Sequence, residues 1–237
     1  MNLKYLHRDN LYYEAIKKMQ PAEILLDIGC GIRPQDHVQA RTHICCEPFD
    51  EYIDVCMSEN RKKKNFIFLK NDWDGALNLF PKNSIDTIML ADVIEHLDKN
   101  TGMELLSKSI ELVNKQVIIF TPLGFMPQEH PDGKDAWGLN GGKWQEHKSG
   151  WLPDDFKENE WSFLVSKEFH FFYHDGKKCE KPYGAFWAIY TKNSNTKNFN
   201  ARKTLKLVKN HKKFLATKEF IKLPLYLFNK IKSKLVS

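Results

Sequence analysis

The stretch LLDIGCGIRPQD, residues 25–36, decides the fold class of this 237-residue chain. An apolar run ends at Asp27, glycines follow at positions 29 and 31, and Pro34 comes soon after. Buried parallel strands are apolar runs of this kind, and ligands of such sheets bind beyond the carboxyl ends of the strands. Glycine lets a loop take positive φ and lets a ligand come close to the backbone. We therefore interpret Gly29 and Gly31 as a ligand-binding turn, with an ordinary turn between a strand and a helix as the alternative.

Outward from this stretch, strand and helix patterns alternate. Five apolar runs predict strands, at 24–28, 43–47, 66–70, 85–91 and 116–121. Helical patterns lie around 51–59, 74–80, 92–97 and 103–114, and Asp9 is placed to cap a first helix that ends at Met19. This order predicts an α/β fold with a mostly parallel sheet and right-handed crossovers. The connection from Gly31 to His43 is too brief for a full-length crossover helix.

The pattern changes after Thr121. Residues 122–153 hold several glycines and prolines and show no period, and a segment this long inside a compact domain is usually functional. Two aromatic runs follow, at 161–173 and 183–190. Asp175, Gly176 and Pro182 between them mark the turn of a predicted hairpin.

Composition narrows the class of protein. A hydrophobic content of 42% with 28% charged residues is typical of a globular chain. There is no run of 18 apolar residues and no apolar stretch at the N-terminus, so we expect neither a membrane span nor a signal peptide. Five cysteines without C-x-x-C spacing predict reduced thiols in a cytoplasmic protein, with no disulfide framework and no metal centre.

Charge divides the chain into two parts. From Lys192 to the C-terminus the net charge is +12, while the whole chain carries +6, so the rest is mildly acidic at −6. We therefore predict a catalytic domain at 1–191 and a basic, amphipathic helical tail at 192–237. Such a tail suits an anionic membrane surface, which would place the protein at the inner membrane face. Nucleic acid, or docking on the protein's own body or a partner, are the alternatives.

The motif at the glycine turn restricts the ligand. A dinucleotide fingerprint would need a third glycine where Pro34 stands, and the G-K-[ST] of a P-loop is absent. D-x-G-x-G suits a cofactor without phosphates but with an amine, a carboxylate and a ribose. Acids also follow the next predicted strands: Glu47 suits ribose hydroxyls, Asp72 beside Trp73 suits an adenine, and Asp92 follows the fourth strand. Helix caps and core packing are the alternative roles of these residues.

Together these strings resemble the class I S-adenosylmethionine (SAM) methyltransferases, and their type-11 small-molecule branch in particular. The matching strings are LLDIGCG, EPFD, NDWD, FPKNSIDTIMLADVIEHL and VIIFTP. EHKSGWLPDDF, at 146–156, is similar to a sub-branch that methylates cell-surface glycans. The resemblance covers residues 24 to about 191, and it departs from the family at Arg33, where a glycine is usual.

The resemblance implies a Rossmann-like, seven-stranded sheet of order 3-2-1-4-5-7-6, with strand 7 antiparallel and helices on both faces. It implies SAM as cofactor, with S-adenosylhomocysteine as product. Asp27 would contact the methionine amino group, Glu47 the ribose, and Asp72 and Trp73 the adenine. Residues carried over as cofactor-binding are Asp27, Gly29, Cys30, Gly31, Glu47, Asp72, Trp73 and Asp92.

A hydroxyl acceptor would need a general base. His130 and His147 are the candidates, because residues 122–153 follow the fifth strand and would overhang the methyl group; packing is the alternative role for each. Trp137, Trp144 and Trp151 suit either stacking on a ligand or the core of a lid. We predict O-methylation of a small-molecule or sugar-linked acceptor.

Two other functions compete with this one. A nucleic-acid methyltransferase would use the basic tail, but ADVIEH stands where amino-directed base methyltransferases carry N/D-P-P-Y/F. We therefore do not expect nucleic acid as the partner. A non-catalytic SAM-binding module is the other alternative.

Overall fold

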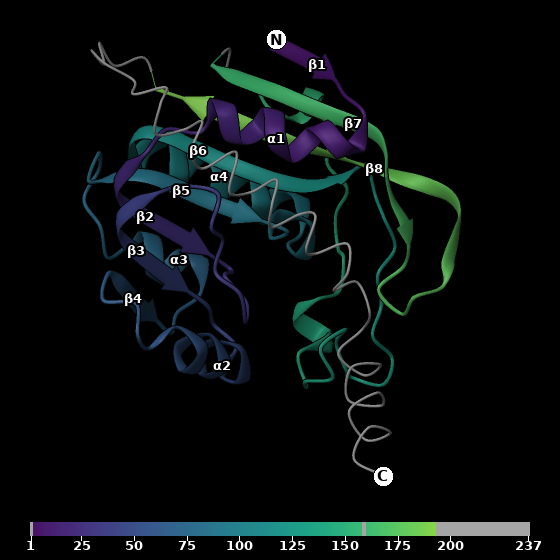
Figure 1. Cartoon of the computed structure of the whole chain (residues 1–237), viewed down its shortest axis with the longest axis horizontal. Coiled ribbons are helices and arrows are strands. Elements are labelled where there is room, and N and C mark those ends of the chain that lie inside the picture. The colour runs from purple at the N-terminus through teal and green to yellow at the C-terminus, as the bar shows by residue number, and fades with distance from the viewer. Residues whose placement is uncertain (1, 158–159, 193–237) are drawn as a thin grey trace.

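The computed structural model describes residues 2–157 and 160–192, and these residues form one eight-stranded sheet (Figure 1). The strands are β1 (Asn2–Tyr5), β2 (Ala22–Ile28), β3 (Ala40–Cys46), β4 (Phe66–Leu69), β5 (Ile85–Ala91), β6 (Val113–Leu123), β7 (Trp161–Phe172) and β8 (Lys178–Thr191). The helices are α1 (Arg8–Lys18), α2 (Asp50–Asn60), α3 (Trp73–Leu77) and α4 (Lys99–Leu112), with short 3₁₀ turns η1 (Ile94–His96), η2 (Gly142–Trp144) and η3 (Pro153–Asp155).

The sheet order is β1-β7-β8-β6-β5-β2-β3-β4, and β8 runs antiparallel to both β6 and β7. The predicted strands 1 to 7 correspond to β2 to β8, so the predicted order and the single antiparallel strand are confirmed. The structure adds an eighth strand, because β1 pairs with β7 in parallel at the sheet edge. Its four residues are largely exposed, so the N-terminal sequence carries no buried-strand pattern that could have predicted it.

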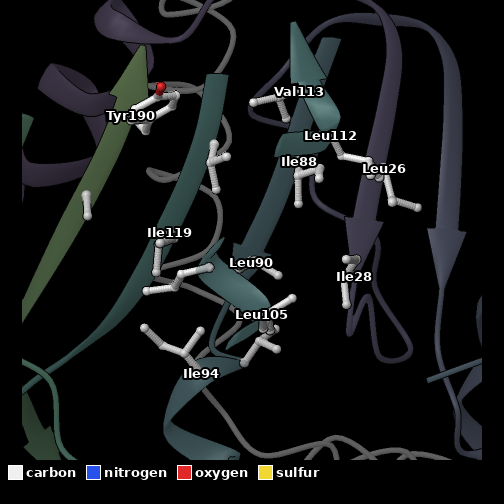
Figure 2. Packing of buried hydrophobic residues seen from close by; sticks show 14 of the residues in the cluster. Leu26, Ile28, Ile88, Leu90, Ile94, Leu105, Leu112, Val113, Ile119 and Tyr190 are labelled. Carbon is white, nitrogen blue, oxygen red and sulfur yellow. The ribbon is translucent and has the colours of Figure 1, made fainter. Parts of the chain in front are cut away.

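Alternate residues of the central strands enter two different cores. Leu26 and Ile88 belong to the core cluster that α4 covers, and Figure 2 shows them beside Leu112 at the end of α4. Leu25 and Met89 face α1 on the other side. Both faces are therefore covered, which explains why the strands are continuous apolar runs.

Two sequence predictions about the ends of elements are wrong. The first helix begins at Arg8 with His7 as its N-cap, so Asp9 lies in the first turn instead of capping it. The turn of the hairpin forms at Asp175 and Gly176 (φ +83°), as predicted, but Pro182 does not belong to it and lies inside β8. The predicted lack of a full crossover helix is confirmed, since residues 29–39 between β2 and β3 form only turns and bends.

The segment after β6, residues 122–153, continues from that strand and returns to its end at Trp151. Trp151 pairs with Leu123 and Gly124 at the end of β6, and it is fully buried. Its indole Nε1 donates to the carbonyl of Ile94, 3.1 Å away. Residues 122–153 are therefore held against η1. Within the described residues, no helix has the length and apolar character needed to span a bilayer.

Candidate active site

A cavity of about 880 Å³ lies at the carboxyl ends of the parallel strands. One wall comes from the ends of β2, β3 and β4: residues 28–37, Glu47, Asp72 and Trp73. A second wall comes from the end of β5 and from the segment after β6. It includes Asp92, Val93, His96, Trp137, Trp144 and Gln145, and it meets the first wall where the Trp137 ring packs beside Gly31 and Tyr52. The volume is in the range of small-molecule and cofactor sites.

The glycine turn has the backbone conformation that the sequence predicts. Gly29 has φ +65° and Gly31 φ +55°, a region that side chains rarely adopt. A Cβ at Gly29 would lie 2.8 Å from Cγ2 of Val93, so glycine also permits the turn to pack against the end of β5. The amides of Gly29 and Cys30 both donate to the Cys46 carbonyl, which attaches the turn to β3.

Glu47 closes this wall from the end of β3. Its carboxylate accepts hydrogen bonds from the amides of Gly31 (2.9 Å) and Phe49 (3.0 Å), and it borders the cavity. Burial raises the pKa of Glu47 to about 7, against the effect of these two amides. The side chain therefore titrates in the physiological range and faces the cavity.

Asp27 lies behind the turn and does not line the cavity. It is buried, and its Oδ2 accepts from the Gln35 amide (2.9 Å) and lies 3.0 Å from Nε2 of His43. In this structure Asp27 shapes residues 29–37, which join β2 to β3. Its contact with a cofactor stays a prediction.

Cys30 borders the cavity but directs its thiol under the turn. The Cys30 and Cys56 sulfurs are 4.0 Å apart, and Cys45 completes a buried cluster of three thiols. The sequence did not predict this cluster, because the three positions are spread over β3, α2 and the turn.

Asp72 and Trp73 border the cavity from the end of β4. Asp72 is also the N-cap of α3, since its Oδ1 accepts from the Gly75 amide at 2.7 Å. The capping role that the sequence left open is therefore real. The Trp73 ring provides the apolar surface of the cavity at the end of β4.

Asp92 follows β5 with φ +53°, which is strained for a residue with a side chain. It lines the cavity and is exposed to it, and the surrounding protein raises its pKa above the ordinary value. Its neighbour Glu95 is buried, and burial together with the charge of Asp92 raises the pKa of Glu95 well above its ordinary value. Oε2 of Glu95 accepts from the Thr121 hydroxyl at 3.0 Å.

The two predicted bases have different surroundings. His147 does not line the cavity itself, but its ring centroid is 5.0 Å from that of His96, which does. Burial lowers the pKa of both rings, that of His96 to about 4, so both are neutral at physiological pH. His130 is buried against His174 with a centroid separation of 4.2 Å, and it lies outside the cavity lining.

Of the two, only His147 therefore touches a residue of the site. No functional role was assigned to His96 or Glu95 from the sequence. The signal that could have found them is the spacing Asp92-x-x-Glu95-His96, which places three polar groups on one turn.

The three tryptophans separate into the two roles that the sequence left open. Trp151 is a core residue, whereas Trp137 and Trp144 line the cavity. Trp144 is 47% exposed, an unusual state for so large an apolar side chain. Both aromatic side chains are available to cover a ligand.

Comparison with solved structures identifies the fold. A SAM-dependent methyltransferase from Leishmania major has a TM-score of 0.50 at 10% identity, over 75% of this chain and 69% of that one. TehB from Haemophilus influenzae has a TM-score of 0.53 at 18% identity, over 79% of this chain and 63% of that one. The YcgJ protein from Bacillus subtilis has a TM-score of 0.51 at 12% identity, over 78% and 99%.

At these identities the similarity defines the fold alone. The chain has the Rossmann-like methyltransferase fold, a mostly parallel sheet that ends in an antiparallel hairpin. No protein-family model matches the sequence, and no curated protein matches it either.

Proposed function

We propose that this protein is a SAM-dependent methyltransferase that acts on a hydroxyl of a small-molecule or sugar-linked acceptor. The observation that carries the proposal is the wall formed by Gly29, Gly31 and Glu47. Two glycines at positive φ expose backbone to the cavity, and a buried carboxylate borders the same space.

The chemistry of the cavity fits SAM better than a dinucleotide. Pyrophosphates are bound at helix N-termini, and no helix follows the glycine turn between residues 29 and 39. Acidic side chains border the cavity instead, at Glu47, Asp72 and Asp92. Carboxylates accept hydrogen bonds from ribose hydroxyls and amino groups, which SAM has, and repel phosphates, which it lacks.

The residues of the chain would bind and orient the reactants. When bound, SAM supplies a methyl group on a sulfonium, which is already a strong electrophile. Glu47 would accept from the ribose, Trp73 would cover the adenine, and Trp137 and Trp144, which lie beside Gly31 and Phe49, would exclude water. Alignment of this kind lowers barriers by roughly 7–11 kcal/mol. His96 is the neutral imidazole that borders the cavity, and His147 lies beside it.

The test has two stages. Isothermal titration calorimetry of the full chain with SAM and with S-adenosylhomocysteine measures binding, and no heat from either compound overturns the proposal. Incubation with SAM and a panel of nucleotide sugars and lipid-linked saccharides then follows, with mass detection of one added CH₂ group. Binding without transfer to any acceptor, RNA included, would instead identify a SAM-binding module.

We further propose that the basic tail, 192–237, holds the protein on an anionic membrane surface. The charge of +12 supports this proposal; the tail lies outside the described residues, apart from Lys192. Co-sedimentation of full-length and 1–191 chains with anionic liposomes is the test. Equal partitioning of the two chains contradicts a membrane role for the tail.

A further inference from the structure

Three potential metal ligands converge where η1 meets the segment after β6. One atom each from Glu95, His96 and His147 lies within 4.8 Å of the others. The backbone fixes this arrangement, because the amides of Lys148 (2.7 Å) and Ser149 (3.1 Å) both donate to the carbonyl of Glu95. Groups 50 residues apart in the chain are therefore held together.

Both imidazoles are oriented by backbone carbonyls. Nδ1 of His96 lies 3.0 Å from the carbonyl oxygen of Glu146, and Nδ1 of His147 lies 2.6 Å from that of Met126. A carbonyl only accepts, so each Nδ1 carries the proton and each Nε2 keeps its lone pair. Metal-binding histidines have this arrangement, in which the other ring nitrogen donates to a carbonyl or carboxylate.

Glu95 shares a proton with a neighbouring acid. Its Oε2 accepts from the Thr121 hydroxyl, and Oε1 is buried and receives no hydrogen bond from any other group among the described residues. The Asp92 carboxyl, which borders the cavity, forms a side-chain hydrogen bond with the Glu95 carboxyl. Two imidazoles and two carboxyl groups therefore gather in one place, and two neighbouring acids without a counter-charge are costly unless a proton or a cation lies between them. A cation among them would satisfy all four.

We propose that Glu95, His96 and His147 bind a divalent first-row transition-metal ion, with Asp92 beside it on the cavity side. Mixed imidazole and carboxylate ligands select Mn²⁺, Fe²⁺, Co²⁺ or Zn²⁺ over Mg²⁺. Ligand atoms about 2.1 Å from a tetrahedral ion lie about 3.4 Å from one another, so atoms that are now up to 4.8 Å apart would approach by as much as about 1.4 Å on binding. This site revises the sequence-based expectation of no metal centre.

The position of the site suggests its use, and this step rests on the proposed function. With only three protein ligands, the ion would keep open coordination positions. These positions would face the cavity, because Asp92 and His96 border it. An acceptor hydroxyl on such a position would release its proton to water more easily, as bound water does. The oxygen would then form a bond to the methyl carbon while the bond from sulfur to carbon breaks and its electron pair stays on sulfur. The acceptor class is therefore an alcohol or sugar hydroxyl.

Direct metal binding to the full chain is the test. The protein is treated with a chelator and titrated with Co²⁺, which is followed by visible absorption and by calorimetry, and Mg²⁺ serves as the comparison ion. Co²⁺ also reports its ligands: thiolate bonds absorb strongly in the near ultraviolet, so binding at the Cys30, Cys45 and Cys56 cluster would be recognised. Cys56→Ser removes that cluster as a site and should leave the proposed binding unchanged.

The expected result is one Co²⁺ per chain, with affinity reduced by at least about 10- to 100-fold in His147→Ala and in Glu95→Gln. The matched control is His7→Ala, which removes an exposed histidine near the N-terminus and distant in sequence from the three ligands. This variant should bind Co²⁺ as wild type does. Glu95→Gln keeps the side-chain volume, so the test stands even where loss of the His147 ring destabilises the fold. No saturable Co²⁺ binding, or binding that survives both substitutions, overturns the inference. SAM titrations of the same samples show separately whether the proposed function fails.

Discussion

The two walls of the cavity are built in different ways. The wall at β2, β3 and β4 consists of residues directly after strands, and its hydrogen bonds run between neighbouring strand ends, such as Gly31 to Glu47. The second wall depends on contacts between segments far apart in the chain, such as Trp151 to Ile94 of η1 and Trp137 to Tyr52 of α2. Strand register therefore positions the residues of the first wall, and packing between distant segments positions those of the second. The substitutions below test whether the first wall binds the cofactor and whether the second wall takes part in the reaction of the acceptor.

The largest expected effect comes from removing the anchor of the second wall. Trp151→Ala deletes a fully buried ring and two hydrogen bonds, to Ile94 and Ser149, and should lower the free energy of unfolding by about 3–5 kcal/mol. Urea denaturation of wild type and variant measures this difference in the free energy of unfolding. Trp144→Ala, in the same segment but half exposed, should leave stability nearly unchanged and weaken substrate binding. Equal stability losses in the two variants would show that Trp151 does not anchor the segment.

The second comparison separates the two predicted bases. His147→Ala should reduce turnover by roughly 10²- to 10⁴-fold while SAM affinity stays the same, because it removes either a base beside His96 or one ligand of the proposed metal site. His130→Ala removes a histidine of the same segment that lies outside the cavity lining, and its turnover should be near wild type. Steady-state kinetics and calorimetry on both variants provide the measurement. Wild-type turnover in His147→Ala removes it from the mechanism.

The third comparison uses pH to test the first wall. Because the folded protein holds the Glu47 proton up to about pH 7, its ionised carboxylate becomes available as pH rises through that value. S-adenosylhomocysteine affinity should therefore increase between pH 6 and 8. Glu47→Gln should flatten this increase and weaken binding by about tenfold or more, the effect of one charged hydrogen bond.

The same pKa has a consequence for stability. The unfolded chain releases the Glu47 proton near its ordinary value of 4.5, well before the folded protein does. The folded state therefore binds more protons between these two values, and the free energy of unfolding contributed by this group falls as pH rises through that interval.

The control for the pH profile of affinity is Asp54→Asn, which changes an exposed acid on α2 and should reproduce the wild-type profile. A profile in Glu47→Gln that matches wild type would assign the titration to another group, such as Asp92.

The smallest effect concerns the conformation of the glycine turn. Gly29→Ala places a side chain at φ +65° and 2.8 Å from Val93, and should weaken S-adenosylhomocysteine binding by roughly tenfold, since left-handed backbone costs about 1–2 kcal/mol. Gly176→Ala imposes similar strain at φ +83° in the hairpin turn, where a Cβ would meet no atom within 4 Å. It should lower the melting temperature without changing affinity. Unchanged affinity in Gly29→Ala would count against the turn as a binding surface.

Much of the first wall could be predicted from sequence for a specific reason. A parallel strand is a local, apolar pattern, and its carboxyl end is marked by the first polar or glycine residue. Gly29, Glu47 and Asp72 were therefore found from position alone. Asp27 shows the limit of this reasoning, because the strand pattern does not reveal that its carboxylate turns toward His43 and Gln35.

The sequence by itself determined the α/β class, the strand order implied by its resemblance, and the acids and glycines at the strand ends. The class and the strand ends follow from local periodicity and backbone conformation, and the strand order follows from the family resemblance alone. Only the tertiary structure decided that β1 adds an eighth strand, that Trp151 is core while Trp144 borders the cavity, and that Glu95, His96 and His147 meet. Those outcomes depend on contacts between segments far apart in the chain, for which a single sequence contains no periodic signal.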